Sequence, residues 1–186
     1  MHEDEVSHQR KIIKIKADLL CMGISPNKTV ETIYHRQNPC QDWKTGNVGI
    51  HISLENGSHV LVTVSHLFDQ RSPYSIEYKE ERLVLLKGGK VVNQVKEVPM
   101  PNWYYRKTTS GNPMPAFFLH EGKTFLHQAY SGCDHHSINM GCRFCGTGFD
   151  WKIGTPQEIS EIVAEAVKEN REYHVCLGGG TRLPLN

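Results

Sequence analysis

The chain has 186 residues, of which 38% are hydrophobic and 22% are charged, so it can bury a core and does not have the composition of a disordered protein. Lys and Arg number 21 against 20 Asp and Glu, and this balance argues against a broadly basic surface for nucleic acid. No apolar stretch reaches the roughly 20 residues of a membrane-spanning helix, and the N-terminus lacks the apolar segment of a secretory signal. We therefore expect no membrane partner.

The cysteines indicate the compartment. Of the 6 cysteines, three lie close together and three are scattered, at Cys21, Cys40 and Cys176. Such uneven spacing, without an export signal, fits a reducing compartment and one metal site better than a disulfide framework. We therefore expect a cytoplasmic protein. Cys176 stands inside the apolar run "YHVCL", so we interpret it as a core cysteine.

Two helices are predicted near the N-terminus. The first covers residues 5–22, with Gly23 as its C′ residue and Pro26 just beyond it. Four apolar residues share one face of this helix: Val6, Ile13, Ala17 and Leu20. The second helix is shorter and covers residues 28–36, before Pro39.

Residues 48–98 are predicted to be mostly strands and turns. Alternating apolar and polar residues flank Asn56-Gly57, and an Asn-Gly pair in that setting is a strong hairpin signal because both residues tolerate a positive φ. Gly88-Gly89 separates two Val- and Leu-rich runs in the same way. We assign residues 1–115 to an N-terminal α+β accessory region that is rich in hairpins.

Residues 98–115 are rich in Pro, Gly and polar residues and include three adjacent aromatic residues, Trp103, Tyr104 and Tyr105. We interpret this stretch as a linker or lid segment between two units, on the surface and pinned by a small aromatic cluster. A platform on which nucleic-acid bases stack is the alternative. Arg106 and Lys107 are too few cations, however, to line a groove for the backbone of a nucleic-acid strand.

Residues 116–186 are assigned to a second unit. It begins with a hairpin that turns at Glu121-Gly122, and its second arm runs from Thr124 into a cysteine-rich stretch. The clearest helix of the sequence follows, with Thr155 as N-cap and Glu158 completing a capping box. Its apolar residues recur at helical spacing, at Ile159, Ile162, Val163, Ala166 and Val167.

A short apolar strand over residues 173–177 closes this order and ends on Gly178, Gly179 and Gly180. Strand, cysteine loop, helix and strand form one βαβ unit with two parallel strands and a right-handed crossover. The functional loops of such units follow the carboxyl ends of the strands. We therefore expect the cysteine loop and the three glycines to lie at one edge of the sheet.

Cys133, Cys142 and Cys145 are separated by eight and by two residues in "SGCDHHSINMGCRFCGTGFDW". Three thiolates on a [4Fe–4S] cluster leave one iron open. Structural zinc instead takes a closed set of four ligands, and the fourth would be His135, His136 or the distant Cys176. We interpret the two histidines as polar loop residues. Chance packing of the cysteines is disfavoured, because their setting is glycine-flanked and polar.

This stretch resembles the cluster-binding loop of radical S-adenosylmethionine (radical SAM) enzymes, in which C-x3-C-x2-C follows the first strand of a partial (β/α) barrel. An aromatic residue usually precedes the last cysteine, and Phe144 stands at that position. The family's glycine-rich motif follows the second strand, where this chain has "LGGGTRLP". The chain departs from the pattern in its first gap of eight residues, which leaves the subfamily open. The resemblance covers residues 124–186.

The resemblance implies that Cys133, Cys142 and Cys145 hold a [4Fe–4S] cluster whose open iron binds S-adenosylmethionine. Backbone near Phe144 would meet the adenine, and Gly178, Gly179 and Gly180 would admit the methionine amino group. The enzyme would cleave S-adenosylmethionine reductively to a 5′-deoxyadenosyl radical, with electrons from a flavodoxin- or ferredoxin-like donor, and the substrate stays open.

The fold that the resemblance implies is an α+β N-terminal region followed by the first βαβ unit of a partial (β/α) radical SAM barrel. Because such a barrel needs further βα units, we expect either a missing C-terminal segment or a partner subunit to complete it. Two other functions remain as alternatives. One is a zinc-binding interaction module without catalysis, and the other is a cluster carrier, for which a fourth cysteine ligand would be expected.

Overall fold

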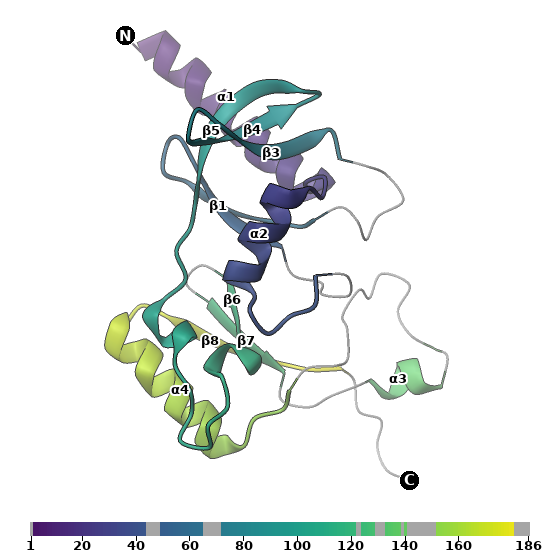
Figure 1. Cartoon of the computed structure of the whole chain (residues 1–186), viewed down its shortest axis with the longest axis vertical. Coiled ribbons are helices and arrows are strands. Elements are labelled where there is room, and N and C mark those ends of the chain that lie inside the picture. The colour runs from purple at the N-terminus through teal and green to yellow at the C-terminus, as the bar shows by residue number, and fades with distance from the viewer. Residues whose placement is uncertain are drawn as a thin grey trace. The chain divides into compact units, whose positions relative to one another are not determined.

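The computed structural model describes residues 2–43, 49–64, 72–121, 124–128, 133–138, 140 and 152–180. The chain forms two compact units (Figure 1). The first consists of Met1–Pro39 with Val48–Pro99, and the second of Cys40–Asn47 with Met100–Asn186. Among the described residues, no helix is both long and apolar enough to cross a lipid bilayer.

The first unit is an α+β structure with two helices, α1 (His2–Met22) and α2 (Lys28–Gln37). Its five strands are β1 (Ile50–Leu54), β2 (His59–Val62), β3 (Tyr74–Lys79), β4 (Arg82–Lys87) and β5 (Lys90–Glu97). They form one sheet in the order β2-β1-β5-β4-β3, and every neighbouring pair is antiparallel. Both predicted helices are confirmed to within a few residues.

Both glycine-based hairpins are also confirmed. β1 and β2 pair antiparallel on either side of Asn56-Gly57, from Ile50↔Val62 to Ser53↔His59. β4 and β5 pair around Gly88-Gly89, whose φ angles of 56° and 79° lie in the left-handed region that glycine adopts without strain. A third hairpin, between β3 and β4, turns at Glu80-Glu81 and has no glycine to signal it.

The buried face of α1 is not the one that its apolar pattern suggested. Ile12, Ile15 and Leu19 are at most 5% exposed and belong to the core. The expected stripe instead faces solvent, with Val6 44%, Ile13 66% and Leu20 59% exposed, and Ala17 exposed as well. The helix therefore has two apolar faces, and only one of them is covered within the first unit.

A buried amide joins α2 to the sheet. The Gln37 side chain donates to the backbone oxygens of His51, at 2.9 Å, and Val98, at 3.0 Å. Its own oxygen accepts from the backbone N–H of His51 at 2.7 Å. Since a buried polar group is costly unless it is hydrogen-bonded, these bonds hold the end of α2 in one position over β1.

The second unit has a sheet of three strands, β6 (Leu119–Glu121), β7 (Thr124–Gln128) and β8 (His174–Gly178), in that order. Its helices are α3 (Asp134–Ser137) and α4 (Pro156–Glu169). β6 and β7 form the predicted antiparallel hairpin, and β7 and β8 are parallel. The sequence of strand, helix and parallel strand is therefore confirmed. No finding tests the rest of a radical SAM barrel, which stays a prediction.

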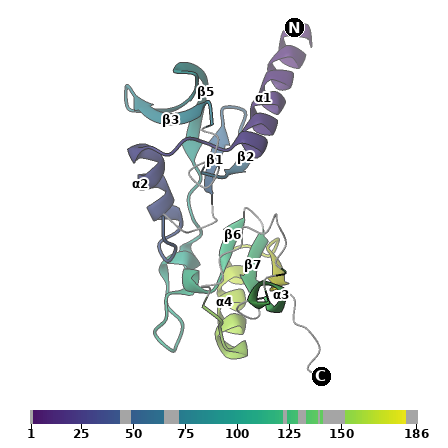
Figure 2. The ribbon, with the colours of Figure 1, turned by 90° about the vertical axis from the view of Figure 1, so that its right-hand side faces the viewer.

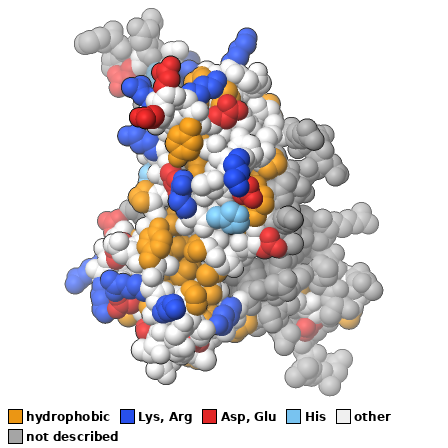
Figure 3. Space-filling view, in the orientation of Figure 1, with side chains coloured by type: hydrophobic (Ala, Val, Ile, Leu, Met, Phe, Trp, Pro, Cys, Tyr) orange, Lys and Arg blue, Asp and Glu red, His pale blue; other side chains and the backbone are white. Residues whose placement is uncertain are grey.

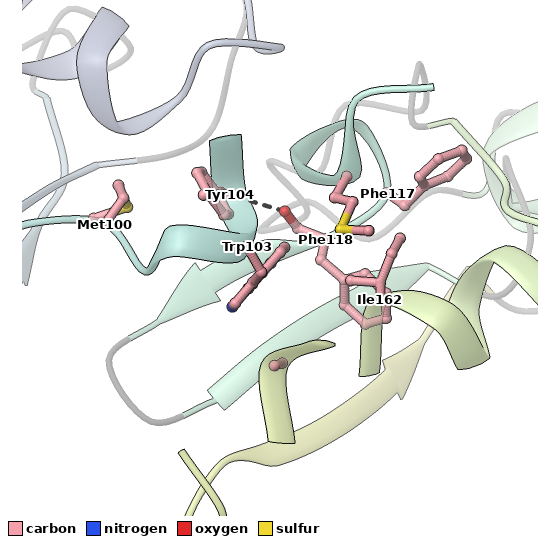
Figure 4. Close-up of a cluster of buried hydrophobic side chains, with 8 residues drawn as sticks. Met100, Trp103, Tyr104, Phe117, Phe118 and Ile162 are labelled. Atoms are coloured by element: carbon pink, nitrogen blue, oxygen red, sulfur yellow. Dashed lines mark hydrogen bonds between the residues drawn. The ribbon is translucent and has the colours of Figure 1, made fainter. Parts of the chain in front are cut away.

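The boundary between the units falls earlier than residue 115, because residues 100–115 pack into the second unit. Two 3₁₀-helices in this stretch, η2 (Asn102–Tyr105) and η3 (Met114–Ala116), surround a buried cluster (Figure 4). The cluster consists of Met100, Trp103, Tyr104, Met114, Phe117, Phe118, Ile162 and Ala166. Two of the three aromatic residues expected in a surface linker are thus core residues. Tyr105 is 70% exposed. Figure 3 shows hydrophobic side chains among Lys and Arg on one face of the molecule.

The turn between β3 and β4 provides the first prediction. Glu80 and Glu81 have φ angles of 49° and 62°, which cost a residue with a Cβ about 1 kcal/mol or more. Replacing Glu80-Glu81 by Asn-Gly should raise the free energy of unfolding by about 1 kcal/mol and the Tm by roughly 2–4 °C. Thermal and urea unfolding measure this. As the opposite control, Gly89→Ala should lower the free energy of unfolding by about 1 kcal/mol. An Asn-Gly variant that is less stable than wild type would contradict the strain argument.

Candidate functional site

The candidate site is the edge of the small sheet at which β7 and β8 both end. The parallel register runs from Thr124↔His174 to Gln128↔Gly178, so the last residues of the two strands are paired with each other. The two strand ends therefore lie side by side at one edge of the sheet, as the sequence predicted, and residues 129–132, which follow β7, lie outside the described residues. In Figure 1, α3 lies on the side toward which β8 runs.

The cysteine loop leaves the sheet at this edge. Cys133, five residues beyond the end of β7, is half-buried and directly precedes α3. His135 lies within α3 and is also half-buried. Cys142, Phe144 and Cys145 lie outside the described residues.

Cys133 is the one described residue of the expected ligand set. Cys133 supplies a thiolate, the ligand type that iron–sulfur clusters take, and follows a strand whose carboxyl end meets that of β8. Within the described part of the chain, no three His, Cys, Asp or Glu side chains come together as a metal site. The proposed ligand set includes Cys142 and Cys145, so this finding concerns other sites.

The glycines follow β8 directly. Gly178 is the last residue of β8, and Gly179 and Gly180 continue the chain beyond the paired end of the strand. They stand where the sequence placed them. The residues of β8 itself are more open than expected, because Val175 and Leu177 are 40% and 62% exposed.

Cys176 is a correction to the sequence interpretation, because its side chain is exposed and not in a core. The reason is that both faces of β8 are open among the described residues, since the side chains of residues 174–177 are all exposed. Cys21 and Cys40 are exposed too, and none of these three cysteines forms a disulfide within the described part.

The start of α4 is fixed by the predicted capping box. The backbone N–H of Glu158 donates to the Thr155 hydroxyl at 3.2 Å, and the backbone N–H of Thr155 donates to the Glu158 carboxylate at 3.0 Å. A capping box satisfies two backbone donors that the first turn of a helix otherwise leaves unpaired. α4 therefore begins at a defined residue, close in sequence to the end of the cysteine loop.

Residues 102–112, which we call the strap, lie along α4 in antiparallel order. Four glutamates of α4, spaced by three or four residues, hold the strap. Glu169 accepts hydrogen bonds from the backbone of Asn102 and Trp103, and Glu165 forms an ion pair with Arg106. Glu161 accepts from Thr109, and Glu158 accepts from Asn112. The donor-to-oxygen distances are 3.0 Å for Asn102, 2.9 Å for the Thr109 backbone and 2.7 Å for Asn112. The strap thus fixes the polar side of α4.

Two of these carboxyls are held in their charged form. The hydrogen bond from the Thr155 backbone, and then that from the Asn112 amide, lower the pKa of Glu158. The hydrogen bond from Lys168, and then the charges of Lys168 and Arg106, lower the pKa of Glu165. Both carboxylates therefore stabilise the strap above the ordinary pKa of glutamate.

The sequence interpretation missed the strap, although it carried a signal. Glu158, Glu161, Glu165 and Glu169 repeat at helical spacing beside the apolar stripe of the predicted helix. That pattern marks a polar face, but it resembles any solvated face, and its partners lie some fifty residues away in the sequence.

No protein-family model matches this chain, and neither a curated protein nor a solved structure matches it.

The lowered carboxyl pKa values predict acid sensitivity of the second unit. A group whose folded pKa is lowered contributes stability that is present above its unfolded pKa and is lost as the pH falls through the folded pKa. Below about pH 4.5, the wild-type chain should therefore lose stability partly through Glu158 and Glu165. Glu158→Gln keeps a capping-box acceptor without the charge, so it should lose less stability than wild type between pH 7 and pH 3.

Urea unfolding at a series of pH values measures this difference. The control is Glu77→Gln, an exposed position of β3 in the first unit, which should leave the pH profile of the second unit unchanged. A Glu158→Gln profile parallel to that of wild type would show that this carboxylate does not couple to unfolding.

Proposed function

We propose that this chain carries the cofactor-binding part of a radical SAM enzyme. The observation that carries the proposal is the parallel register of β7 and β8, in which Gln128 pairs with Gly178. It supports the proposal because a loop with three cysteines and a run of three glycines then leave one edge of one sheet. A zinc module or a carrier protein does not require the glycines at that edge.

The residues have separate roles in this proposal. The thiolates of Cys133, Cys142 and Cys145 hold three irons of a [4Fe–4S] cluster, and the fourth iron stays open for S-adenosylmethionine. Gly178, Gly179 and Gly180 let the methionine amino group approach the backbone, because glycine has no Cβ to block it. The backbone near Phe144 contacts the adenine.

When bound, the cluster would supply one-electron chemistry: an electron passed to the sulfonium would break its bond to the 5′ carbon and leave methionine and a 5′-deoxyadenosyl radical. The protein contributes the orientation of S-adenosylmethionine and the exclusion of water. The capping box of α4 and the strap support this proposal, because they hold the crossover helix between β7 and β8, from whose ends the two loops continue. The substrate, small or macromolecular, stays open.

Other components follow from the same proposal. An electron donor of the flavodoxin or ferredoxin type docks near the cluster, and the cluster and its thiolates suit a reducing cytoplasm. Further βα units, from a C-terminal segment or a partner subunit, cover β8. The support for them is the exposure of Val175 and Leu177, because strands of parallel sheets are normally buried on both faces.

Anaerobic purification tests the proposal. The protein should be brown and contain about four irons and four sulfides per chain. Adding S-adenosylmethionine should change the electron paramagnetic resonance signal of the reduced cluster, because a ligand now occupies the open iron. A colourless protein with one zinc per chain would support the zinc module instead. A brown protein whose electron paramagnetic resonance signal is unchanged by S-adenosylmethionine would support the cluster carrier.

Cys145→Ala removes one proposed ligand and should abolish the cluster absorbance and lower the iron content to background. Cys40→Ala is the matched control, since Cys40 is an exposed cysteine outside the loop. Iron and sulfide analysis after anaerobic reconstitution compares the two. Equal iron in both variants would mean that the ligand assignment is wrong.

Gly179→Val places a branched side chain where S-adenosylmethionine approaches the end of β8. It should weaken S-adenosylmethionine binding at least about tenfold and leave the iron content unchanged. Equilibrium dialysis with labelled S-adenosylmethionine measures the Kd. Leu177→Ala, an exposed position two residues earlier, serves as the control. An unchanged Kd for Gly179→Val would remove the glycines from the proposed site.

A further inference from the structure

The uncovered apolar face of α1 has the geometry of a coiled-coil seam. Val6, Ile13 and Leu20 are seven residues apart, and Arg10 and Ala17 fall between them at alternating spacings of four and three. This is the a/d pattern of a heptad repeat, with Val6, Ile13 and Leu20 at d and Arg10 and Ala17 at a. All five side chains are exposed.

The first unit does not use this face. The opposite side of α1 carries the buried Ile12, Ile15 and Leu19. In Figure 2, α1 lies at one side of its unit, and its N-terminal part extends past the strands. The seam therefore lies on a helix whose position is already fixed by its other face.

From Val6 to Leu20 the charges beside the seam have one sign, and the a position before Val6 is Glu3. The flanking e and g positions include Lys14 and Lys16, and Arg10 stands in the seam itself. Over residues 6–21, no Asp or Glu occupies an a, d, e or g position. Asp18 is turned elsewhere, since its carboxylate accepts from Tyr74 at 2.7 Å and from Lys87 at 2.9 Å. The surface that complements this face is therefore acidic.

A second copy of the chain does not complement the seam. In a parallel pair of copies Arg10 would face Arg10 across the seam, and no Asp or Glu at an a, d, e or g position of residues 6–21 offsets Arg10, Lys14 and Lys16 in either orientation. A lipid surface fits poorly as well. Helices that lie in a membrane interface present a broad apolar face, whereas this stripe is one residue wide at each turn.

We propose that the outer face of α1 docks one amphipathic helix of a partner protein, through a two-helix seam centred on Ile13 and with Asp or Glu of the partner beside Arg10, Lys14 and Lys16. This inference is independent of the proposed cofactor chemistry. Knobs from the partner pack around Val6, Ile13 and Leu20, and the carboxylates select the partner and its orientation.

The test uses a designed, fluorescently labelled helical peptide of about three heptads, with Leu at a and d and Glu at e and g. Fluorescence anisotropy with the full chain should show binding that weakens as salt rises, because flanking charge pairs are screened. The same peptide with Lys at e and g should bind at least about tenfold more weakly.

Variants of the chain locate the contact. Ile13→Asp should weaken binding of the Glu peptide at least about tenfold, and its circular dichroism should match wild type because Ile13 is 66% exposed. Val91→Asp is the matched control, since Val91 is 53% exposed on β5 of the same unit, and should bind as wild type does. Exchanging Lys14 and Lys16 for Glu should reverse the preference between the two peptides.

Several outcomes would overturn the proposal. They are no binding of the Glu peptide, equal binding by Ile13→Asp, or equal binding of both peptides. Sedimentation that shows a wild-type dimer converted to a monomer by Ile13→Asp would assign the face to a second copy. Cosedimentation with phosphatidylserine vesicles, lost in the same variant, would assign it to a lipid surface.

Discussion

The second unit depends on the burial of one face of α4 against an aromatic cluster. Ile162 and Ala166 are completely buried among Trp103, Phe117 and Phe118. Fully burying a side chain such as Ile162 contributes roughly 1.5–3 kcal/mol, and the aromatic residues add a larger apolar area. Two parallel strands cannot be joined by a tight turn, so β8 reaches its place beside β7 only through this packed crossover helix. The common edge at which β7 and β8 end follows from that packing.

The polar side of α4 is held by a different force from its apolar side. The strap covers the polar side of α4, whose carboxylates accept hydrogen bonds from backbone and side-chain donors of the strap. The stability of this contact therefore depends on the charge of the carboxylates and on pH. The aromatic residues and the strap come from the same stretch of chain, residues 100–118. A segment with the composition of a linker thus becomes the support of the crossover.

Two apolar surfaces stay open in the described part of the chain, and they differ in kind. β8 exposes Val175 and Leu177 on a strand with a free edge, which suits the addition of further sheet. α1 exposes a narrow heptad seam between cations, which suits one acidic helix. The surface on β8 belongs to the proposed catalytic part, and the seam on α1 lies on the accessory unit. The proposed catalysis and the proposed binding of a partner helix would therefore be carried by different parts of the chain.

Local rules were sufficient for much of this protein. The Asn56-Gly57 and Gly88-Gly89 turns, the Gly23 stop and the capping box of Thr155 each depend on residues within a few positions of one another, so the sequence by itself determined them. The order of strand, helix and strand likewise determined that β7 and β8 are parallel. Which of the two apolar faces of α1 is buried was decided only by tertiary packing, because Ile12, Ile15 and Leu19 form as good a stripe as Val6, Ile13 and Leu20. Tertiary structure also decided that Trp103 lies in a core and Cys176 on a surface, since burial depends on what other parts of the chain place beside a residue.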